Sequence, residues 1–210
     1  MPTTDLMEAL FIDSVSFMPL WRQELSRQAG GTPRVADLGP EVWLAKLGSS
    51  VMRDREALKA EAFVNKQRGS LDTFYVWNPK AQYPQADPAG TVLGASTVRI
   101  YELGGDSKSL RLNGLPAGYA ITIGDFMAFD HGSAPVHRCL HQFVASTVAD
   151  SGGITPLVEV APHIRVGATT GLVVSLKRPA AEMMIVPGSY ETRSTRPRMS
   201  AISLTAVQVP

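Results

Sequence analysis

The sequence has a single cysteine, Cys139, among its 210 residues. One thiol cannot form a disulfide within the chain, so we expect a fold that does not depend on oxidation and that forms in a reducing cytoplasm. The first ten residues, MPTTDLMEAL, lack the basic start and the apolar run of a secretory signal peptide. No segment approaches the ~18 to 20 consecutive apolar residues that cross a bilayer, and we expect no membrane partner.

A strong charge of either sign is also missing, since the formal net charge is +1 with 19% charged residues. A near-neutral chain has no electrostatic footprint for binding DNA or RNA. It also has little repulsion between copies, which suits a protein that docks to others. The hydrophobic content of 44% is enough for one folded domain, or for one domain with a second lobe.

The chain consists mostly of short apolar segments separated by glycine and proline, which is typical of strands and turns. Their spacing predicts a mainly β fold with antiparallel sandwich or barrel-like lobes. Pro19 places the first of these strands at a sheet edge or at a bulge. The predicted strands cover residues 15–25, 35–38, 41–51, 71–77, 91–103, 109–112, 119–123, 126–129, 136–149, 157–160, 172–176, 183–186 and 199–207.

One segment, residues 53–68, is predicted to be a helix that packs one stripe on a sheet. Asp54 is placed to cap its start, and Glu56 lies in the first turn, where a carboxylate is favourable. Leu58 and the residues one turn away supply an apolar face. Gly69 follows the last basic residues and ends the helix.

The pattern divides the chain into four parts. Residues 1–14 are weakly patterned and are predicted to form a mobile N-terminal arm. Residues 15–79 form a strand–helix–strand lobe, and the proline-rich residues 80–90 form an extended loop. Residues 91–210 form a β-rich lobe, either separate from the first or continuous with it as one domain.

His137, Cys139 and His141 share one face of a predicted strand, with His131 nearby, and His and Cys are ligands for zinc or copper. Structural zinc sites generally use pairs of cysteines, and this chain has only one. The alternative is a strand whose polar residues face solvent or a neighbour and whose core face carries Leu140. A cysteine in mid-strand is a small buried hydrophobe more often than an activated nucleophile. The strand therefore favours neither a metal site nor a cysteine hydrolase.

Two further groups have an enzymatic or binding interpretation beside a structural one. Asp125 and Asp130 flank an apolar strand, and two carboxylates can hydrolyse a glycoside when they are held about 5 to 10 Å apart. Asp125 lies in a turn, however, where aspartate bonds its own backbone. Four aromatic residues suit either a sugar platform or core packing, and the core is favoured. They are Trp21, Trp43, Tyr75 and Trp77. We expect no catalytic, cofactor-binding or metal-binding residues and therefore no enzyme.

A small basic run follows Tyr190 and contains Arg193, Arg196 and Arg198. The chain as a whole is not basic, so nucleic acid is a poor partner for this run. The planar guanidinium binds carboxylates in a bidentate way, which suits interfaces between subunits. We therefore predict that these arginines pair with acidic groups on a neighbouring subunit.

The order of these features resembles that of siphovirus distal tail proteins and related minor tail proteins of the phage tail tip. In the N-terminal part, Trp43 and the helix at 53–68 are followed by Gly69, Phe74 and the Asn78-Pro79 turn. That series matches a pattern in which a helix precedes a "G-x-x-x-x-F" strand.

The second part continues the resemblance to phage tail proteins. Residues 110–118, with Asn113-Gly114, and residues 124–126 are similar to the stretch "L-x-L-x-G-L-P-x-G … G-D-[hydrophobic]" of many tail proteins. Residues 158–165 and 177–179 follow in the same order. The resemblance spans about residues 15–186. Each motif alone is only a strand or a turn, so the resemblance rests on the order of the motifs.

The resemblance implies a structural virion protein without cofactors. Such proteins form a homo-oligomeric ring, more often a hexamer than a trimer, at the distal end of a long non-contractile tail. The implied partners are other copies of the chain, the tail tube protein, the tail-tip hub protein and the tape measure protein, with DNA only in passage. Assembly takes place in the bacterial host cytoplasm. Residues 1–14 and 80–90, including Tyr83, and the three arginines are the expected inter-subunit contacts.

Two alternatives belong to other classes of function. The first is a carbohydrate-binding β-sandwich module of a phage baseplate, which needs exposed aromatic side chains. The second is a metal-dependent hydrolase that uses the segment from His131 to His141, or a carboxylate glycosidase. Another minor tail or completion protein on a similar lobe stays within the virion class.

Overall fold

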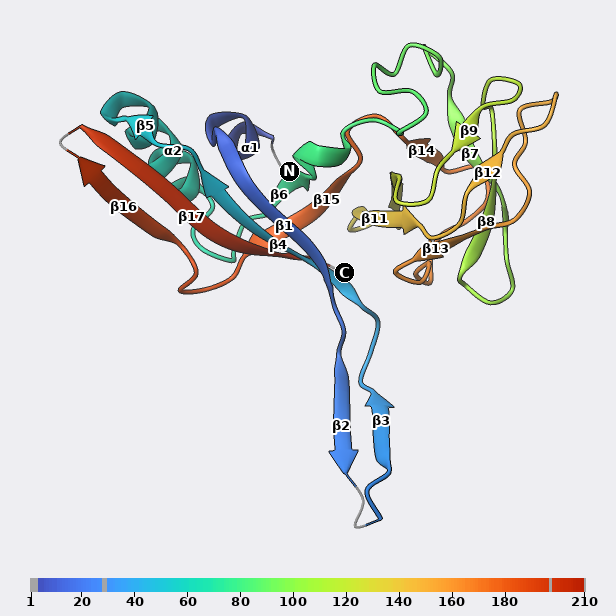
Figure 1. The fold of residues 1–210 in the computed structure, drawn as a ribbon, viewed down its shortest axis with the longest axis horizontal. Coiled ribbons are helices and arrows are strands. Elements are labelled where there is room, and N and C mark those ends of the chain that lie inside the picture. Colours follow the sequence, from blue (N-terminus) through green and yellow to red (C-terminus); the bar gives the residue numbers. More distant parts are fainter. Residues whose placement is uncertain (1–3, 28–29, 197, 210) are drawn as a thin grey trace.

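The computed structural model describes residues 4–27, 30–196 and 198–209. It consists of a sheet lobe, a barrel lobe and a hairpin that projects from the sheet (Figure 1). Every strand pairing among the described residues is antiparallel. The predicted fold class is therefore confirmed: the fold is mainly β, with a closed barrel and one long packed helix.

The sheet lobe contains strands from both ends of the chain. Its main strands lie in the order β1 (Ile12–Leu20), β4 (Val42–Ser49), β17 (Met199–Gln208), β15 (Ala180–Ile185) and β6 (Phe74–Trp77). Two further strands, β16 (Glu191–Arg196) and β5 (Met52–Arg53), pair with the first half of β17. The position of β1 at an edge agrees with the prediction from Pro19.

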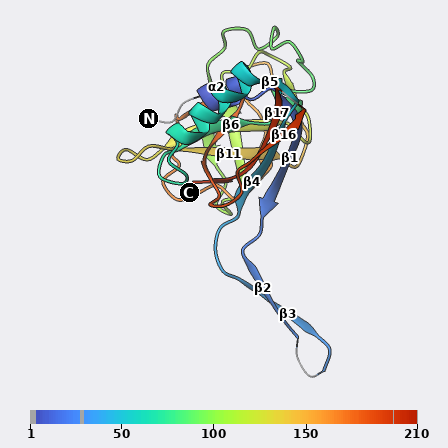
Figure 2. The same ribbon diagram turned by 90° about the vertical axis from the view of Figure 1, so that its left-hand side faces the viewer.

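Helix α2 (Asp54–Lys66) covers one face of this sheet (Figure 2). Its buried residues Ala57, Ala60 and Val64 recur every three or four positions, so they form one stripe that packs on the sheet. The helix begins one residue later than predicted, and the Glu56 carboxylate accepts the backbone N–H of Arg53 over 3.4 Å. A short 3-10 turn, η1 (Pro79–Ala81), follows β6.

The prediction of a mobile arm at residues 1–14 is wrong for the residues that the structure describes. Residues 5–9 form a short helix, α1 (Asp5–Ala9), and β1 begins at Ile12. Leu6, Met7 and Leu10 are at most 4% exposed and belong to the core of the sheet lobe. The apolar side chains at these spacings are too few to reveal a helix in the sequence, and burial stabilises it here.

The barrel lobe is closed by six strands in the order β10, β11, β13, β8, β7 and β14. It has its own apolar core, separate from that of the sheet lobe. A closed barrel offers no open strand edge for pairing with another chain. Its strands are β7 (Val98–Leu103), β8 (Ser109–Asn113), β10 (Phe126–His131), β11 (His137–Phe143), β13 (Val158–Ala161) and β14 (Val173–Ser175), with a small sheet of β9 (Ala120–Ile121) and β12 (Thr147–Val148) beside it.

The division between lobes differs from a simple cut in the sequence. Residues 91–210 were expected in one β-rich lobe, but residues 180–208 form strands of the first sheet. The barrel is thus inserted between β6 and β15, which pair directly with each other. Within the connecting loop at 80–90, the buried Asp87 carboxylate accepts the backbone N–H groups of Val92 and Leu93.

Some predicted strands also divide or shorten. The segment at 15–25 is two strands, because the ribbon is interrupted at Trp21 and Arg22 before the hairpin. The segment at 136–149 likewise gives β11 and β12, and the segment at 91–103 is loop until Val98. Strand β16 was interpreted only as a basic run, since its polar sequence ETRSTR lacks apolar alternation.

The two lobes are held together by side chains from β4 and β11. The Trp43 indole N–H donates to the Leu140 carbonyl over 2.8 Å, and the ring packs on Phe126 with centroids 5.6 Å apart. Arg138 forms a bidentate ion pair with Asp130 and lies 4.4 Å from the centre of the Tyr75 ring. These contacts fix the barrel against the sheet.

Replacing Gly153 with alanine should unfold the barrel more readily. The residue has φ +75°, and a Cβ atom there would lie 2.1 Å from the Leu115 carbonyl oxygen. We expect a loss of about 2 to 4 kcal/mol in the free energy of unfolding, from backbone strain plus this clash. Gly188→Ala is the matched control, with the same φ and open space around the Cβ, and should cost only about 1 kcal/mol. Urea unfolding of both variants measures the difference, and equal losses would contradict the role of the clash.

Candidate functional site: two open sheet edges and a projecting hairpin

The hairpin of β2 (Gln23–Arg27) and β3 (Pro33–Asp37) extends the β1–β4 ribbon away from the body of the protein (Figures 1 and 2). Its strands pair only with each other among the described residues. Leu25 and Val35 face each other across the two strands and are 59% and 61% exposed. An isolated two-stranded hairpin is marginally stable in water, so this element gains most from contact with another molecule.

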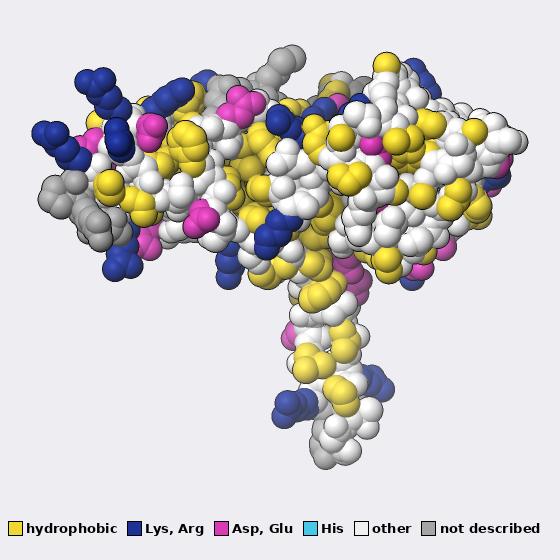
Figure 3. Space-filling model, turned by 45° about the horizontal axis from the view of Figure 1, so that its top comes forward, with side chains coloured by type: hydrophobic (Ala, Val, Ile, Leu, Met, Phe, Trp, Pro, Cys, Tyr) yellow, Lys and Arg dark blue, Asp and Glu magenta, His cyan; other side chains and the backbone are white. Residues whose placement is uncertain are grey.

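Apolar side chains also lie at the base of the hairpin. Trp21 and Leu38 are 60% and 61% exposed, and the Leu38 N–H donates to the Arg22 carbonyl where the ribbon is interrupted. The space-filling view shows hydrophobic side chains along the hairpin and basic ones towards its tip (Figure 3). The exposed apolar side chains along the hairpin and at its base make it a candidate interaction surface.

The outer edge of β1 is the first open edge of the sheet. The backbone N–H of Trp43 donates to the Gln208 side chain over 3.2 Å, so at this position the β4 backbone faces β17. Trp43 is opposite Pro19 in β1, and this pair is therefore not hydrogen-bonded. By alternation, the peptide groups of Phe17 and Val15 point away from β4, towards the open edge.

The outer edge of β16 is the second open edge, on the other side of the sheet. The backbone N–H of Ile202 donates to the Ser49 hydroxyl over 2.9 Å, so it faces away from β16. Its partner in β16 is Thr192, whose peptide groups therefore face outward. In the part of the chain that the structure describes, β1 pairs only with β4 and β16 only with β17.

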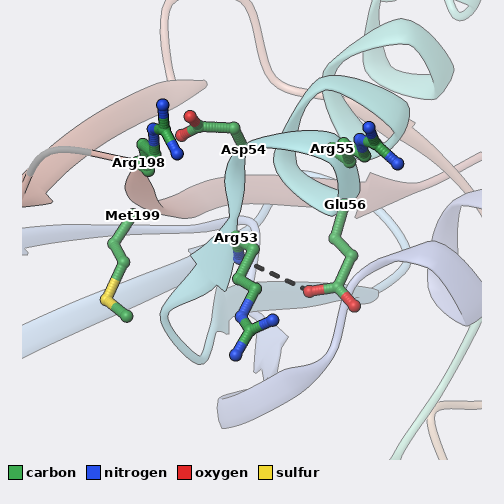
Figure 4. A pocket seen from close by; sticks show the side chains of 6 residues that line it. All are labelled: Arg53, Asp54, Arg55, Glu56, Arg198 and Met199. Atoms are coloured by element: carbon green, nitrogen blue, oxygen red, sulfur yellow. Dashed lines mark hydrogen bonds between the residues drawn. The ribbon is translucent and has the colours of Figure 1, made fainter.

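Two of the predicted contact residues lie along this second edge. Arg193 is exposed on β16, and Arg198 is exposed in the turn before β17. Arg198 also lines an open hollow of about 840 Å³ at the start of α2 with Arg53 and Arg55 (Figure 4). Arg196 is the last residue of β16, and its side chain lies outside the described residues.

Tyr83 is not part of the arginine group. It lies in the connecting loop between the lobes and packs against Gly90, where a Cβ atom would be 2.9 Å from its ring. Among the residues that sequence reasoning selected, Arg193 and Arg198 thus lie on the same β16–β17 hairpin but line different hollows, and Tyr83 lies apart from both. The hairpin and the two edges were missed as a site, although Pro19 was a signal for one of them.

The histidine and cysteine residues around β11 are placed differently from the prediction of a polar outer face. Cys139 and His141 are 2% and 1% exposed and belong to the barrel interior, while Leu140 on the other face packs into the core of the sheet lobe. The Cys139 sulfur lies 3.5 Å from Nδ1 of His131. Burial raises the pKa of the Cys139 thiol to about 11, so it stays protonated and is a poor nucleophile. Across the described ranges, no three His, Cys, Asp or Glu side chains are grouped to hold a metal ion.

The remaining candidate groups take structural positions. The buried Asp125 carboxylate accepts the backbone N–H of Thr122 in its own turn and that of Gln85 in the connecting loop. Asp130 is paired with Arg138. Trp43 and Trp77 are at most 9% exposed, so they do not form a sugar platform with the exposed Trp21.

Comparisons with known proteins do not add a family. The sequence matches no model of a known protein family, and a search of curated proteins finds no relative. Within the described residues, no helix is long and apolar enough to cross a membrane.

Proposed function

We propose that this chain is a structural subunit that pairs with copies of itself, edge to edge, into a closed ring. In this proposal the ring lies at the distal end of a long non-contractile phage tail and joins the tail tube to the tip hub. One observation carries the proposal: a single sheet has an open strand edge at β1 and, on the far side of β17, a second one at β16, next to the part of the sheet that ends in β6.

The strand directions support head-to-tail pairing of identical copies. Each of β1, β4, β17 and β16 is antiparallel to the next, so β16 runs opposite to β1. When a second copy lies beside the first in the same orientation, its β1 meets β16 as an antiparallel neighbour. Antiparallel strands pair readily across chains, and a heterologous contact of this kind closes into a ring when the rotation between copies allows it.

The offset between the two edges supports closure. The centre of β1, at Ser16, is level with Thr205 of β17, whereas the centre of β16, near Arg193, is level with Ala201. For β1 of the next copy to overlap β16 fully, that copy must be shifted along the strand direction by about four residues, or roughly 14 Å. Across the sheet, the four strands of one copy span about 19 Å. The resulting strand tilt of about 36° lies in the range of closed barrels.

The charges at the two edges are complementary in this arrangement. With the strand centres aligned, the exposed Asp13 at the start of β1 comes level with the end of β16, next to Arg198 of the neighbouring copy. An arginine–carboxylate contact between copies fits the role predicted for this basic run.

The face of the sheet opposite α2 supports a water-filled lumen. A shallow groove of about 390 Å³ there is lined by hydroxyl and lysine side chains together with the apolar Val15, Leu47 and Leu204; the polar residues include Ser14, Ser16, Lys46, Ser203 and Thr205. These residues alternate with the buried ones that pack under α2, so they share the outer face. The hydroxyl and lysine groups on this face would face the lumen and permit passage of DNA, and the hairpin would reach beyond the ring towards the tube or the hub.

The test is the mass and shape of the particle in solution. Six copies joined with the derived offset enclose a ring of backbone about 45 Å across. We expect light scattering to give a hexamer mass and negative-stain electron microscopy to show annular particles of that inner sheet diameter. A monomer at high micromolar concentration, both alone and with purified tail tubes, would overturn the proposal.

A further inference from the structure

All four histidines of the chain lie between residues 131 and 163, in the barrel lobe. His141 is the most buried of them, with 1% of its surface exposed. Its ring stacks on Phe129 at a centroid distance of 5.2 Å and an angle of 12°. The sheet lobe, by contrast, contains no histidine, so acid titration near neutral pH acts on the two lobes differently.

The hydrogen bonds of His141 define its protonation. Its Nδ1 lies 2.8 Å from the Pro162 carbonyl, which accepts and cannot donate, so Nδ1 carries the proton. The other nitrogen, Nε2, is buried and has no hydrogen-bond partner in the structure. A proton added to Nε2 would therefore have no acceptor, and a buried charge without a partner is strongly unfavourable.

The charged groups near His141 oppose protonation as well. Arg165, from the loop after β13, and His131, from β10, both act on it as positive charges. Cys139 on its own strand stays neutral. The Arg165 guanidinium donates to the Glu41 carbonyl of the sheet lobe, which is neutral and does not offset the charge.

We propose that the barrel is an acid-sensitive module, which opens when His141 takes up a proton while the sheet lobe stays folded. The two lobes have distinct apolar clusters, and of the barrel strands only Phe126, Ala128 and Leu140 belong to the cluster of the sheet lobe, which permits the rest of the barrel to open without that lobe. The inference does not depend on assembly into a ring.

The stability of the barrel depends on pH because the pKa of His141 differs between the closed and the open state. Burial lowers the pKa of His141 from 6.5 to about 4. A histidine with a lowered pKa in the folded state stabilises the fold fully above about pH 6.5, and this stability is lost as the pH falls towards 4, because only the open state binds the proton. Between pH 7 and 4.5 the ratio of open to closed barrel should rise roughly 50-fold.

Cys139 provides the measurement, since it is the only thiol and is buried in the barrel beside His131. The rate at which a dipyridyl disulfide modifies Cys139 is measured at pH 7 and at pH 4.5, because this reagent stays reactive in acid. Each rate is divided by the rate for the urea-unfolded chain at the same pH. We expect this ratio to rise by roughly 50-fold on acidification. A matched control places a cysteine in the sheet core by Ala60→Cys in a Cys139→Ala background, and that thiol should remain protected.

Substitutions then assign the effect to His141. His141→Gln and His141→Phe both remove the titrating group, and either folded variant should lose the acid response. His163→Gln removes an exposed histidine of the same lobe and should keep it. Three results would overturn the proposal: the same relative rate for Cys139 at pH 4.5 as at pH 7, an unchanged response in a folded His141 variant, or an equal rise for the thiol at position 60.

Discussion

Val15→Pro should leave the chain folded and reduce the particle to single copies. The peptide group of Val15 points away from β4, so proline removes no hydrogen bond within the sheet. The same N–H would donate to β16 of the next copy in the proposed ring, and proline removes that donor and adds bulk at the joint. We expect the mass from light scattering to fall about sixfold, with the circular dichroism spectrum retained.

Ser16→Pro is the matched control one residue along. Its peptide group points towards β4, so proline there removes a bond of the β1–β4 ladder and should destabilise the sheet lobe itself, by about 3 kcal/mol. The two neighbouring substitutions thus separate assembly from folding. An unchanged ring mass for Val15→Pro would show that β1 is not at the joint, even if the ring itself exists.

Trp43→Ala should destabilise the whole chain by about 3 to 5 kcal/mol. The side chain is 3% exposed and packs between Phe17 and Phe126, so it belongs to the sheet core and touches the barrel at the same time. Its loss leaves a cavity at the junction and removes the donor to the Leu140 carbonyl. Urea unfolding should show a lower midpoint and a second transition, because the lobes lose their main coupling.

Trp43→Phe separates the two contributions of this residue. Phenylalanine keeps most of the aromatic packing and removes the indole N–H, so we expect a loss of only about 1 to 2 kcal/mol. If Trp43→Ala cost no more than Trp43→Phe, packing at the junction would contribute little. A single sharp transition in Trp43→Ala would contradict the coupling role assigned to this side chain.

The fold class was predictable because local patterns carry it. The turns around Asn113-Gly114 and Gly124, together with apolar strands between them, give the barrel strands within a few residues. The helix at 54–66 follows from one apolar stripe and a glycine stop. The return of residues 180–208 to the first sheet was not predictable, since pairing between strands more than a hundred residues apart leaves no local pattern in either strand.

The candidate site was predictable only in part. The arginine run drew attention to one of the two edges, since Arg193 lies on β16. An open edge, however, is a property of backbone groups, and most side chains do not report which way a peptide N–H points. Pro19 is the exception, because its missing N–H tolerates only an outward position. The apolar residues of the hairpin looked like core residues, and only their exposure identifies them as a surface.

The barrel enters and leaves the sheet at adjacent points, since Trp77 of β6 is paired directly with Ala180 of β15. Residues 78–179, which lie between them, therefore form an inserted segment, or cassette, that does not interrupt the sheet. Such a cassette can be exchanged over evolution, or by an engineer, without altering the strands that would join one copy to the next. The constraint on any replacement is local: it must present an apolar surface and a carbonyl to Trp43.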